Sequence, residues 1–161
     1  MSTQISPPQG VALDAWVRFL RAQAAVIRQL NAELVVAHGL TINDYEVLLH
    51  LSRAPERVLR RVDLAERVVL TPSGITRLLA GLERAGWVER AECSSDARVS
   101  YARLTDAGYA KLREAAATHL AGVREHFTGR FGADELEALS TLLGRLPGNE
   151  EETEDDCEPA A

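Results

Sequence analysis

Cysteine is scarce in this chain of 161 residues, which contains only Cys93 and Cys157. Two isolated cysteines form no disulfide framework and lack the spacing of metal ligands, so both kinds of scaffold are excluded. No apolar run approaches the roughly 18 residues that are needed to span a bilayer. The first residues lack a cationic segment followed by an apolar core, so we expect no secretory signal, no membrane partner and a cytoplasmic location.

Catalytic motifs are also missing from the sequence. The chain has no GxSxG, no P-loop, no HExxH and no dinucleotide-binding glycine pattern. We therefore expect a protein that is not an enzyme and that requires no cofactor and no metal.

Positive charge is in the minority overall, since 18 basic residues face 24 acidic ones and the net charge is −6. The acidic residues are unevenly placed, because residues 149–161 carry seven of them and no base. The rest of the chain has 18 bases and 17 acids, and the stretch from Arg53 to Arg113 has twelve bases and eight acids. A locally basic region beside an acidic tail is compatible with a nucleic-acid partner but does not identify one.

The two ends of the chain have the composition of irregular segments. Residues 1–10 are polar and contain Pro7, Pro8 and Gly10, which predicts a flexible arm. Residues 147–161 begin with Pro147-Gly148 and continue as the acidic run, which predicts a disordered tail.

Long amphipathic helices are expected on both sides of the central region. The first runs from about Val11 to Ala37 with apolar residues every seven positions, the second from Asp106 to about Arg130, and the last over Ala133–Leu146. Their apolar faces require partner helices, so residues 11–38 and 105–146 are predicted to be dimerisation helices. The contacts expected there are Leu13, Leu20, Ile27, Leu136 and Leu139.

Residues 41–104 contain the helix caps, helix breakers and strand patterns of a small domain with both helices and strands. Thr41 caps a helix that stops at Pro55, Thr71 caps another that closes at Gly86, and a short helix over Asp63–Val68 lies between them. After Gly86 the apolar period changes to that of strands. The remaining elements are an extended piece over Val58–Arg60, strands over Trp87–Arg90 and Val99–Leu104, and a polar turn over Ala91–Arg98.

The order helix, helix, hairpin is that of a winged helix-turn-helix, so the predicted fold class is mainly α with a small β-hairpin wing (α+β). In this arrangement the second helix of the pair enters the major groove of DNA and the hairpin reaches the neighbouring backbone or minor groove. Small and hydrogen-bonding side chains open that helix, where its positive dipole end favours phosphate. They are Ser73, Gly74, Thr76 and Arg77.

The hairpin tip supplies a second group of candidate contacts. Arg98 can insert into a narrow minor groove, where the negative potential is strongest. Asp96 would repel DNA, so we expect it to pair with an arginine and orient the wing. Arg60 and Arg61 either touch phosphates or belong to the ordinary surface.

Several segments together resemble the multiple-antibiotic-resistance regulator (MarR) family. The segments are Val62–Arg67, Thr71–Leu78, Leu82–Arg90, Asp96-Ala97-Arg98 and Leu104–Gly108. The resemblance implies a homodimer that binds a palindromic operator in double-stranded DNA, usually as a repressor, and that releases DNA on binding a small, often aromatic or phenolic, acid. It also implies that Ser73, Thr76 and Arg77 face bases or phosphates, that Arg98 enters the minor groove and that Arg90 supports the backbone or wing.

Two alternatives remain open at this point. Trp16 and Tyr45 are the aromatic candidates for ligand contacts, but Trp16 can equally serve core or dimer packing. A winged helix can also bind another protein instead of DNA. The polar and basic start of the second helix disfavours that reading, because a protein-binding groove more often exposes apolar residues.

Overall fold

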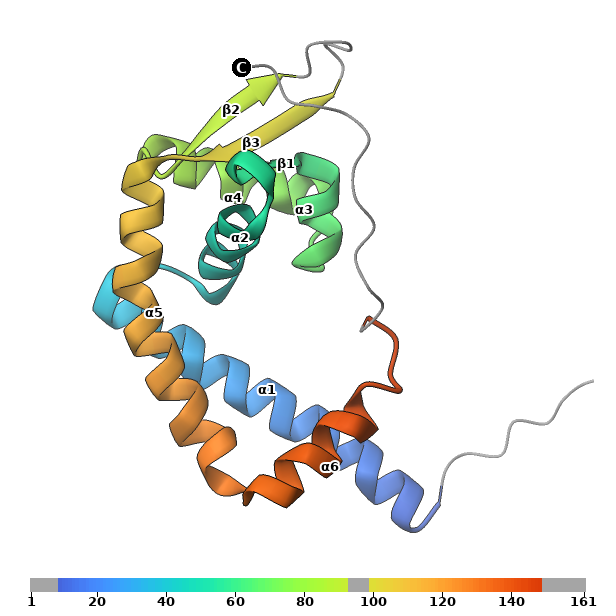
Figure 1. Cartoon of the computed structure of the whole chain (residues 1–161). Coiled ribbons are helices and arrows are strands. Elements are labelled where there is room, and N and C mark those ends of the chain that lie inside the picture. The colour runs from blue at the N-terminus through green and yellow to red at the C-terminus, as the bar shows by residue number, and fades with distance from the viewer. Residues whose placement is uncertain (1–8, 93–98, 149–161) are drawn as a thin grey trace, which may run out of the picture.

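The computed structural model describes residues 9–92 and 99–148, which form a mostly helical protein with one small sheet at one end (Figure 1). Residues 41–104, the winged-helix unit, lie around that sheet, and the long helix α5 (Asp106–His126) runs from it to the opposite end of the protein. There α5 packs on α1 (Val11–His38), and α6 (Ala133–Leu143) follows after a sharp turn. The predicted fold class, mainly α with a β-hairpin wing, is confirmed. None of the helices in the described ranges is long and apolar enough to cross a membrane.

The winged-helix unit contains the elements that the sequence predicts and one further turn. Helix, short strand, two helices and hairpin follow one another in that order. They are α2 (Ile42–Arg53), the 3-10 turn η1 (Pro55–Arg57), β1 (Val58–Arg60), α3 (Arg61–Arg67), α4 (Pro72–Arg84), β2 (Val88–Glu92) and β3 (Ser100–Leu104).

The sheet has the order β1-β3-β2, with both pairs antiparallel. Val58 pairs with Arg103 and Val88 pairs with Leu104, so β3 is the central strand. The extended piece over Val58–Arg60 is therefore a third strand, which the sequence did not reveal. It ties the start of α3 to the same sheet that carries the wing.

One hydrophobic core connects the three helices of the winged-helix unit with the sheet. Leu48, Leu64, Leu79 and Ala102, from α2, α3, α4 and β3, have no exposed surface. The core continues into the long helices through Leu30, Leu34, Leu112 and Ala115. The winged-helix unit and the α1–α5 crossing therefore pack as one body.

Threonine caps start three of the helices, and the caps at Thr41 and Thr71 confirm the sequence predictions. The Thr41 side chain accepts a hydrogen bond from the Asp44 amide, and the Asp44 carboxylate accepts one from the Thr41 amide in return. The Thr71 and Thr105 hydroxyls accept from the amides of Gly74 and Gly108. Each cap satisfies an amide that the helix itself leaves without a partner.

Some predicted helix boundaries are wrong. Helix α3 begins at Arg61, not at Asp63, because Arg60 already belongs to β1 and the chain passes directly from strand to helix. Helix α5 ends at His126, not at Arg130, because Phe127 leaves the helical conformation and packs edge-on against Phe131 with the ring centroids 5.7 Å apart. Helix α6 ends at Leu143, not at Leu146.

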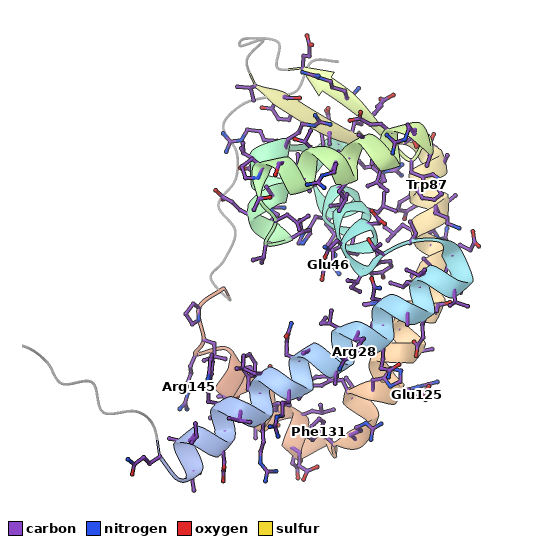
Figure 2. All side chains as sticks on the ribbon, turned by 180° about the vertical axis from the view of Figure 1, so that it is seen from behind. Arg28, Glu46, Trp87, Glu125, Phe131 and Arg145 are labelled. Atoms are coloured by element: carbon purple, nitrogen blue, oxygen red, sulfur yellow. The ribbon has the colours of Figure 1, made fainter. Side chains whose placement is uncertain are left out.

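Two glycines allow α5 to pack closely on both parts of the protein. A Cβ at Gly108 would collide with the backbone carbonyl of Trp87, which lies beside the first turns of α5 (Figure 2). A Cβ at Gly122 would collide with the side chains of Leu30 and Glu33 on α1. Gly108 therefore requires a residue without a side chain, whereas at Gly122 the Leu30 and Glu33 side chains would have to move to admit one.

Replacing Gly108 by alanine is expected to lower the free energy of unfolding by about 1–3 kcal/mol, because the obstacle is backbone and cannot rotate away. Denaturant unfolding measures the loss. Gly81→Ala is the matched control, since the nearest atom to its Cβ is the Arg84 Nη2 at 3.9 Å. That control should gain up to about 1 kcal/mol from helix propensity. Equal stabilities for the two variants would contradict the role of Gly108.

Candidate nucleic-acid interface

Helix α4 separates an apolar face from a polar one. Ile75, Leu79 and Leu82 are buried in the core, whereas Ser73, Thr76 and Arg77 are exposed. Pro72 occupies the first helical position, where the missing amide hydrogen has no partner to lose. The positive dipole end of α4 lies beside these exposed side chains.

Short hydrogen bonds hold the first turn of α4 in place. The Thr71 and Ser73 hydroxyl oxygens lie 3.2 Å apart, and the Thr76 hydroxyl donates to the Pro72 carbonyl at 2.8 Å. The Thr76 oxygen keeps its lone pairs, so it can accept a further bond. A Cβ at Gly74 would lie 3.1 Å from the Thr71 hydroxyl oxygen, so only a small residue suits this turn.

Arg77 forms no ion pair with any residue in the described ranges. Its guanidinium is exposed on the polar face of α4. A guanidinium without an acid partner can bind a phosphate, or a guanine through two parallel hydrogen bonds. Of the predicted α4 contacts, Arg77 is the one that carries charge.

The turn between α3 and α4 contains a strained residue. Val69 has a φ of 53° and an exposure of 89%, in a region that branched side chains rarely adopt. The Leu70 amide donates to the Ala65 carbonyl at 2.8 Å, which holds the turn in this form. Strain of this kind persists because the two packed helices determine the path of the chain between them.

The wing contributes one described candidate. Arg90 is exposed on β2, pairs with Ala102 of β3 and has no ion pair in the part of the chain that the structure describes. The next candidates, Asp96 and Arg98, lie outside the described residues, as does Cys93.

Arg60 and Arg61 have acid partners within the winged-helix unit. The Arg60 guanidinium donates two hydrogen bonds to the Asp63 carboxylate, at 2.9 and 3.1 Å. The Arg61 Nη2 donates to Glu83 across the α3–α4 pair at 2.5 Å. Contacts of these two arginines with phosphate stay predictions. Each arginine also forms an ion pair within the winged-helix unit.

The predicted ligand contacts lie in different surroundings. Trp16 is 54% exposed on α1 and packs near Phe19, with the ring centroids 6.3 Å apart. Tyr45 on α2 is buried, and its ring lies 4.3 Å from that of His119 on α5. The structure therefore gives the two aromatic side chains separate neighbours within one protomer.

The helices around Tyr45 carry several titratable side chains. Burial raises the pKa of Tyr45, and the nearby Arg53 charge partly offsets this. Burial also raises the pKa of Glu46, on the side of α2 toward α1 (Figure 2), and lowers that of His119. Two further histidines join α1 to α5: His38 lies 2.8 Å from the Thr118 hydroxyl, and His126 lies 2.6 Å from a Glu33 carboxylate oxygen.

The predicted dimerisation residues line an uncovered apolar face of the long helices. Leu13, Leu20 and Ile27 on α1 are 42%, 44% and 36% exposed, and Leu136 and Leu139 on α6 are half-buried. Other large apolar side chains on these helices and their ends are exposed with them. They are Val11, Trp16, Phe19, Val35, Val36, Leu120, Phe131, Leu142 and Leu146.

The helix pair α3–α4, whose second helix opens with a polar and basic turn, followed by the hairpin β2–β3 is a winged helix-turn-helix, the arrangement of many DNA-binding regulators. Residues 38–99 match the MarR family. The chain is 32% identical to AbsC, a MarR family transcriptional regulator from Streptomyces coelicolor, over 86% of this chain and 93% of that one, with a TM-score of 0.79. This protein belongs to the MarR family of transcriptional regulators.

Two further solved structures are similar over most of their length. Sco3205, a MarR family transcriptional regulator from Streptomyces coelicolor solved in complex with DNA, is 29% identical over 88% of this chain and 89% of that one, with a TM-score of 0.80. CouR from Rhodococcus jostii, solved with p-coumaroyl-CoA bound, is 26% identical over 85% and 94%, with a TM-score of 0.71.

The lowered pKa of His119 predicts one contribution to the response of stability to acid. Burial lowers this pKa below its ordinary value of about 6.5, so the unfolded chain binds the proton more readily than the folded one. Stability should therefore be full above about pH 6.5 and fall as the pH decreases toward the folded-state pKa. Urea unfolding between about pH 7.5 and about pH 5 measures the trend. His119→Phe keeps a ring against Tyr45 and should flatten it; an unchanged pH slope in that variant would remove His119 as a cause.

Proposed function

We propose that this protein is a sequence-specific, ligand-responsive transcriptional repressor that binds a palindromic operator as a homodimer. The observation that carries this proposal is the exposed polar first turn of α4, where Arg77 is unpaired among the described residues. The wing strand β2 lies in the small sheet with β1 and β3. The DNA complex of the similar regulator Sco3205 supports DNA as the partner.

The proposed DNA contacts fall into two groups. Ser73, Gly74, Thr76 and Arg77 enter the major groove with the start of α4, where close approach needs small residues. Arg90 and Arg98 serve the wing, joined by Arg60 at the end of β1 as a backbone contact beside its partner Asp63. Arg61, the first residue of α3, is held by Glu83. No observation favours the alternative of a protein-binding winged helix, since the exposed start of α4 is polar.

Selection of bound sites from random duplexes tests the proposal as a whole. A dimer of this fold should select a palindrome whose half-sites lie about one helical turn apart, ~10 base pairs. Recovery of no common sequence would reject sequence-specific binding, and a single half-site would reject the dimer.

Arg77→Ala should weaken binding to the selected operator by about 10- to 100-fold, the range expected for loss of one good base contact. Its thermal stability should stay unchanged, because Arg77 has no partner to lose within the described residues. Fluorescence anisotropy on operator and scrambled duplexes measures the effect. Arg113→Ala, an exposed arginine on α5, is the matched control and should bind as the wild type does. Equal affinities for the two variants would exclude Arg77 from the interface.

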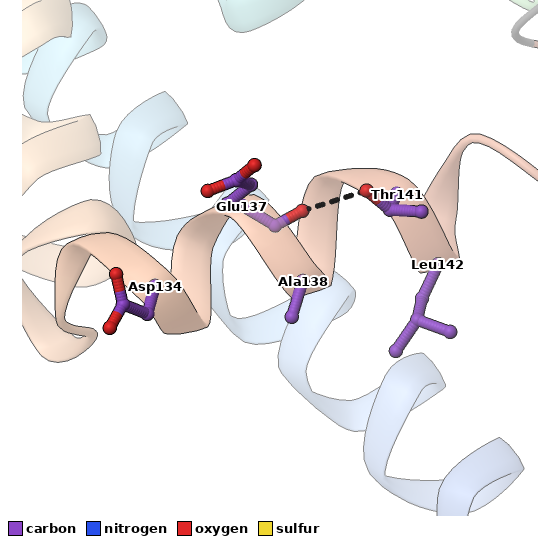
Figure 3. Close-up of a pocket in the computed structure, with 5 residues that line it drawn as sticks. All are labelled: Asp134, Glu137, Ala138, Thr141 and Leu142. Atoms are coloured by element: carbon purple, nitrogen blue, oxygen red, sulfur yellow. Dashed lines mark hydrogen bonds between the residues drawn. The ribbon is translucent and has the colours of Figure 1, made fainter.

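The uncovered apolar face on α1 and α6 supports the homodimer. Monomeric proteins rarely expose a contiguous apolar patch of more than a few hundred Å². Most of the exposed large apolar side chains lie on the long helices, and α1 buries only Leu30 and Leu34 among its 28 residues. An open hollow on α6 is lined by Asp134, Glu137, Ala138, Thr141 and the exposed Leu142 (Figure 3). A second copy of the chain would cover the apolar face.

Leu20→Asp and Leu139→Asp should each yield monomers that no longer bind the palindrome tightly. Leu20 is 44% exposed in the protomer, so a charge there harms an interface more than the core. Analytical ultracentrifugation gives the mass. Val62→Asp is the control, because Val62 is 62% exposed but lies on α3, away from the long helices. Leu20 and Leu139 variants that remain dimers would refute this placement of the interface.

The effector is proposed to be a small aromatic or phenolic acid, and the bound p-coumaroyl-CoA of the similar regulator CouR supports a small-molecule effector of some kind. Trp16 and Tyr45 stay the proposed ligand contacts. Tyr45 is only 4% exposed and its ring lies against His119, so a ligand can reach it only if α5 or the His119 side chain moves.

A further inference from the structure

An ion pair joins the two helices of the helix-turn-helix at their far ends. Arg61 is the first residue of α3, and Glu83 lies in the last turn of α4. The Arg61 Nη2 donates to the Glu83 Oε1, and the two side chains are only 19% and 31% exposed. Such a pair is shielded from water more than an ordinary surface ion pair, so its geometry is held more firmly.

Each of these charges stands at the unfavourable end of its own helix. A helix N-terminus carries partial positive charge and disfavours a cation such as Arg61, and a C-terminus disfavours an anion such as Glu83. Neither charge is therefore explained by the stability of its own helix. The two charges meet across the helix pair, and this ion pair explains their positions.

The pair closes a triangle of helices. At ~1.5 Å per residue, α3 is about 10 Å long and the part of α4 from Pro72 to Glu83 about 17 Å. The turn at Val69 joins these two sides at one corner through the hydrogen bond from Leu70 to Ala65. The Arg61–Glu83 contact forms the third side, and a triangle with three fixed sides has a fixed angle between α3 and α4.

The corner of the triangle at Arg61 is attached to the sheet that carries the wing. Arg60 ends β1 and pairs with Tyr101 of β3, the strand that also forms the hairpin with β2. Arg61 follows it directly, so the position of Arg61 is set by the sheet. Because Glu83 binds Arg61, the end of α4 is also positioned relative to the sheet. This contact sets the direction of α4 relative to the wing.

We infer that Arg61 and Glu83 are a positioning pair that sets the angle of α4 against the wing, so that both elements can engage the same DNA site. The inference rests on the proposed DNA binding. Arg61 acts here through Glu83 and not as a phosphate contact, and an acidic residue, Glu83, supports DNA recognition. Electrostatics alone predicts that Glu83 weakens DNA binding, because an acid near DNA repels it.

The experiment compares full-length variants on two duplexes, the selected operator and a scrambled sequence of equal length. The variants are Arg61→Met, Glu83→Leu and the exchanged double variant Arg61→Glu/Glu83→Arg. Asp106→Ala, which removes the 2.9 Å ion pair between Arg57 and Asp106, is the control for loss of an ion pair elsewhere. Each protein is assayed well below its own melting temperature, and affinity is measured over a range of salt concentrations.

The positioning role predicts that both single variants lower the ratio of operator to scrambled affinity by about tenfold, comparable to one mismatched base pair. Binding of Glu83→Leu to the scrambled duplex should stay equal or become tighter. The exchanged variant should recover the ratio, since it restores the contact and places each charge at the favourable end of its helix. Asp106→Ala should leave the ratio unchanged.

Three outcomes would overturn the inference. A direct phosphate contact would appear as weaker binding of Arg61→Met to both duplexes with a salt slope lower by about one, and no loss in Glu83→Leu. A purely structural pair would lower the melting temperatures and leave the affinity ratios unchanged. A ratio lost in the single variants but not recovered by the exchanged variant would likewise reject the pair. Failure of the wild type to prefer any duplex would instead reject the proposed function, so the two failures are distinct.

Discussion

The close packing of helix α5 against backbone and side chains on both sides sets the arrangement of this protein. Gly108 brings the first turn of α5 onto the carbonyl of Trp87, where the Thr105 amide also donates to that oxygen at 3.1 Å. Gly122 brings the second half of α5 onto Leu30 and Glu33 of α1. Because one helix makes both contacts, a displacement of α1 that carries α5 with it would also move the contact at Trp87. Helix α5 is thus the structural link between α1 and the winged-helix unit.

The arginines of the winged-helix unit divide into two groups by their partners. Arg57 and Arg61 are held by Asp106 and Glu83, and Arg57 also stacks 4.2 Å above the ring of Tyr109. Arg77 and Arg90 are exposed and have no acid partner within the described ranges. A count of basic residues cannot distinguish these groups, although an arginine without an acid partner is the better placed to bind a phosphate backbone. The geometry thus favours Arg77 and Arg90 among the arginines proposed to contact DNA.

Local signals in the sequence were sufficient for most of the fold. Threonine caps and Pro72 determine where helices start through contacts between residues close together in the sequence, and Gly39, with a φ of 66°, ends α1 in the same local way. Contacts beyond the nearest residues decide what local signals leave open. The end of α5 depends on Phe127 meeting Phe131, and the pairing of the predicted extended piece over Val58–Arg60 depends on β3, which is far away in the sequence. Within the site, the exposed α4 residues were predictable from the helical period, but the role of Arg61 stayed open between phosphate contact and ordinary surface, because its partner lies 22 positions away. The sign of the Arg61–Glu83 pair in the sequence was that each charge stands at the helix end that disfavours it.

The α1–α5 crossing has a consequence for how the chain is made. Glu33 and His126 are 93 positions apart, so α1 leaves the ribosome long before the residues on which it packs exist. At roughly 5–20 residues per second, α1 waits on the order of 5–20 seconds with its apolar side in water. During that interval the winged-helix unit, whose contacts are nearer in sequence, is complete and can fold. Helix α1 therefore finds its place after the winged-helix unit that follows it, and its exposed leucines are available to chaperones or to a neighbouring nascent chain in the meantime.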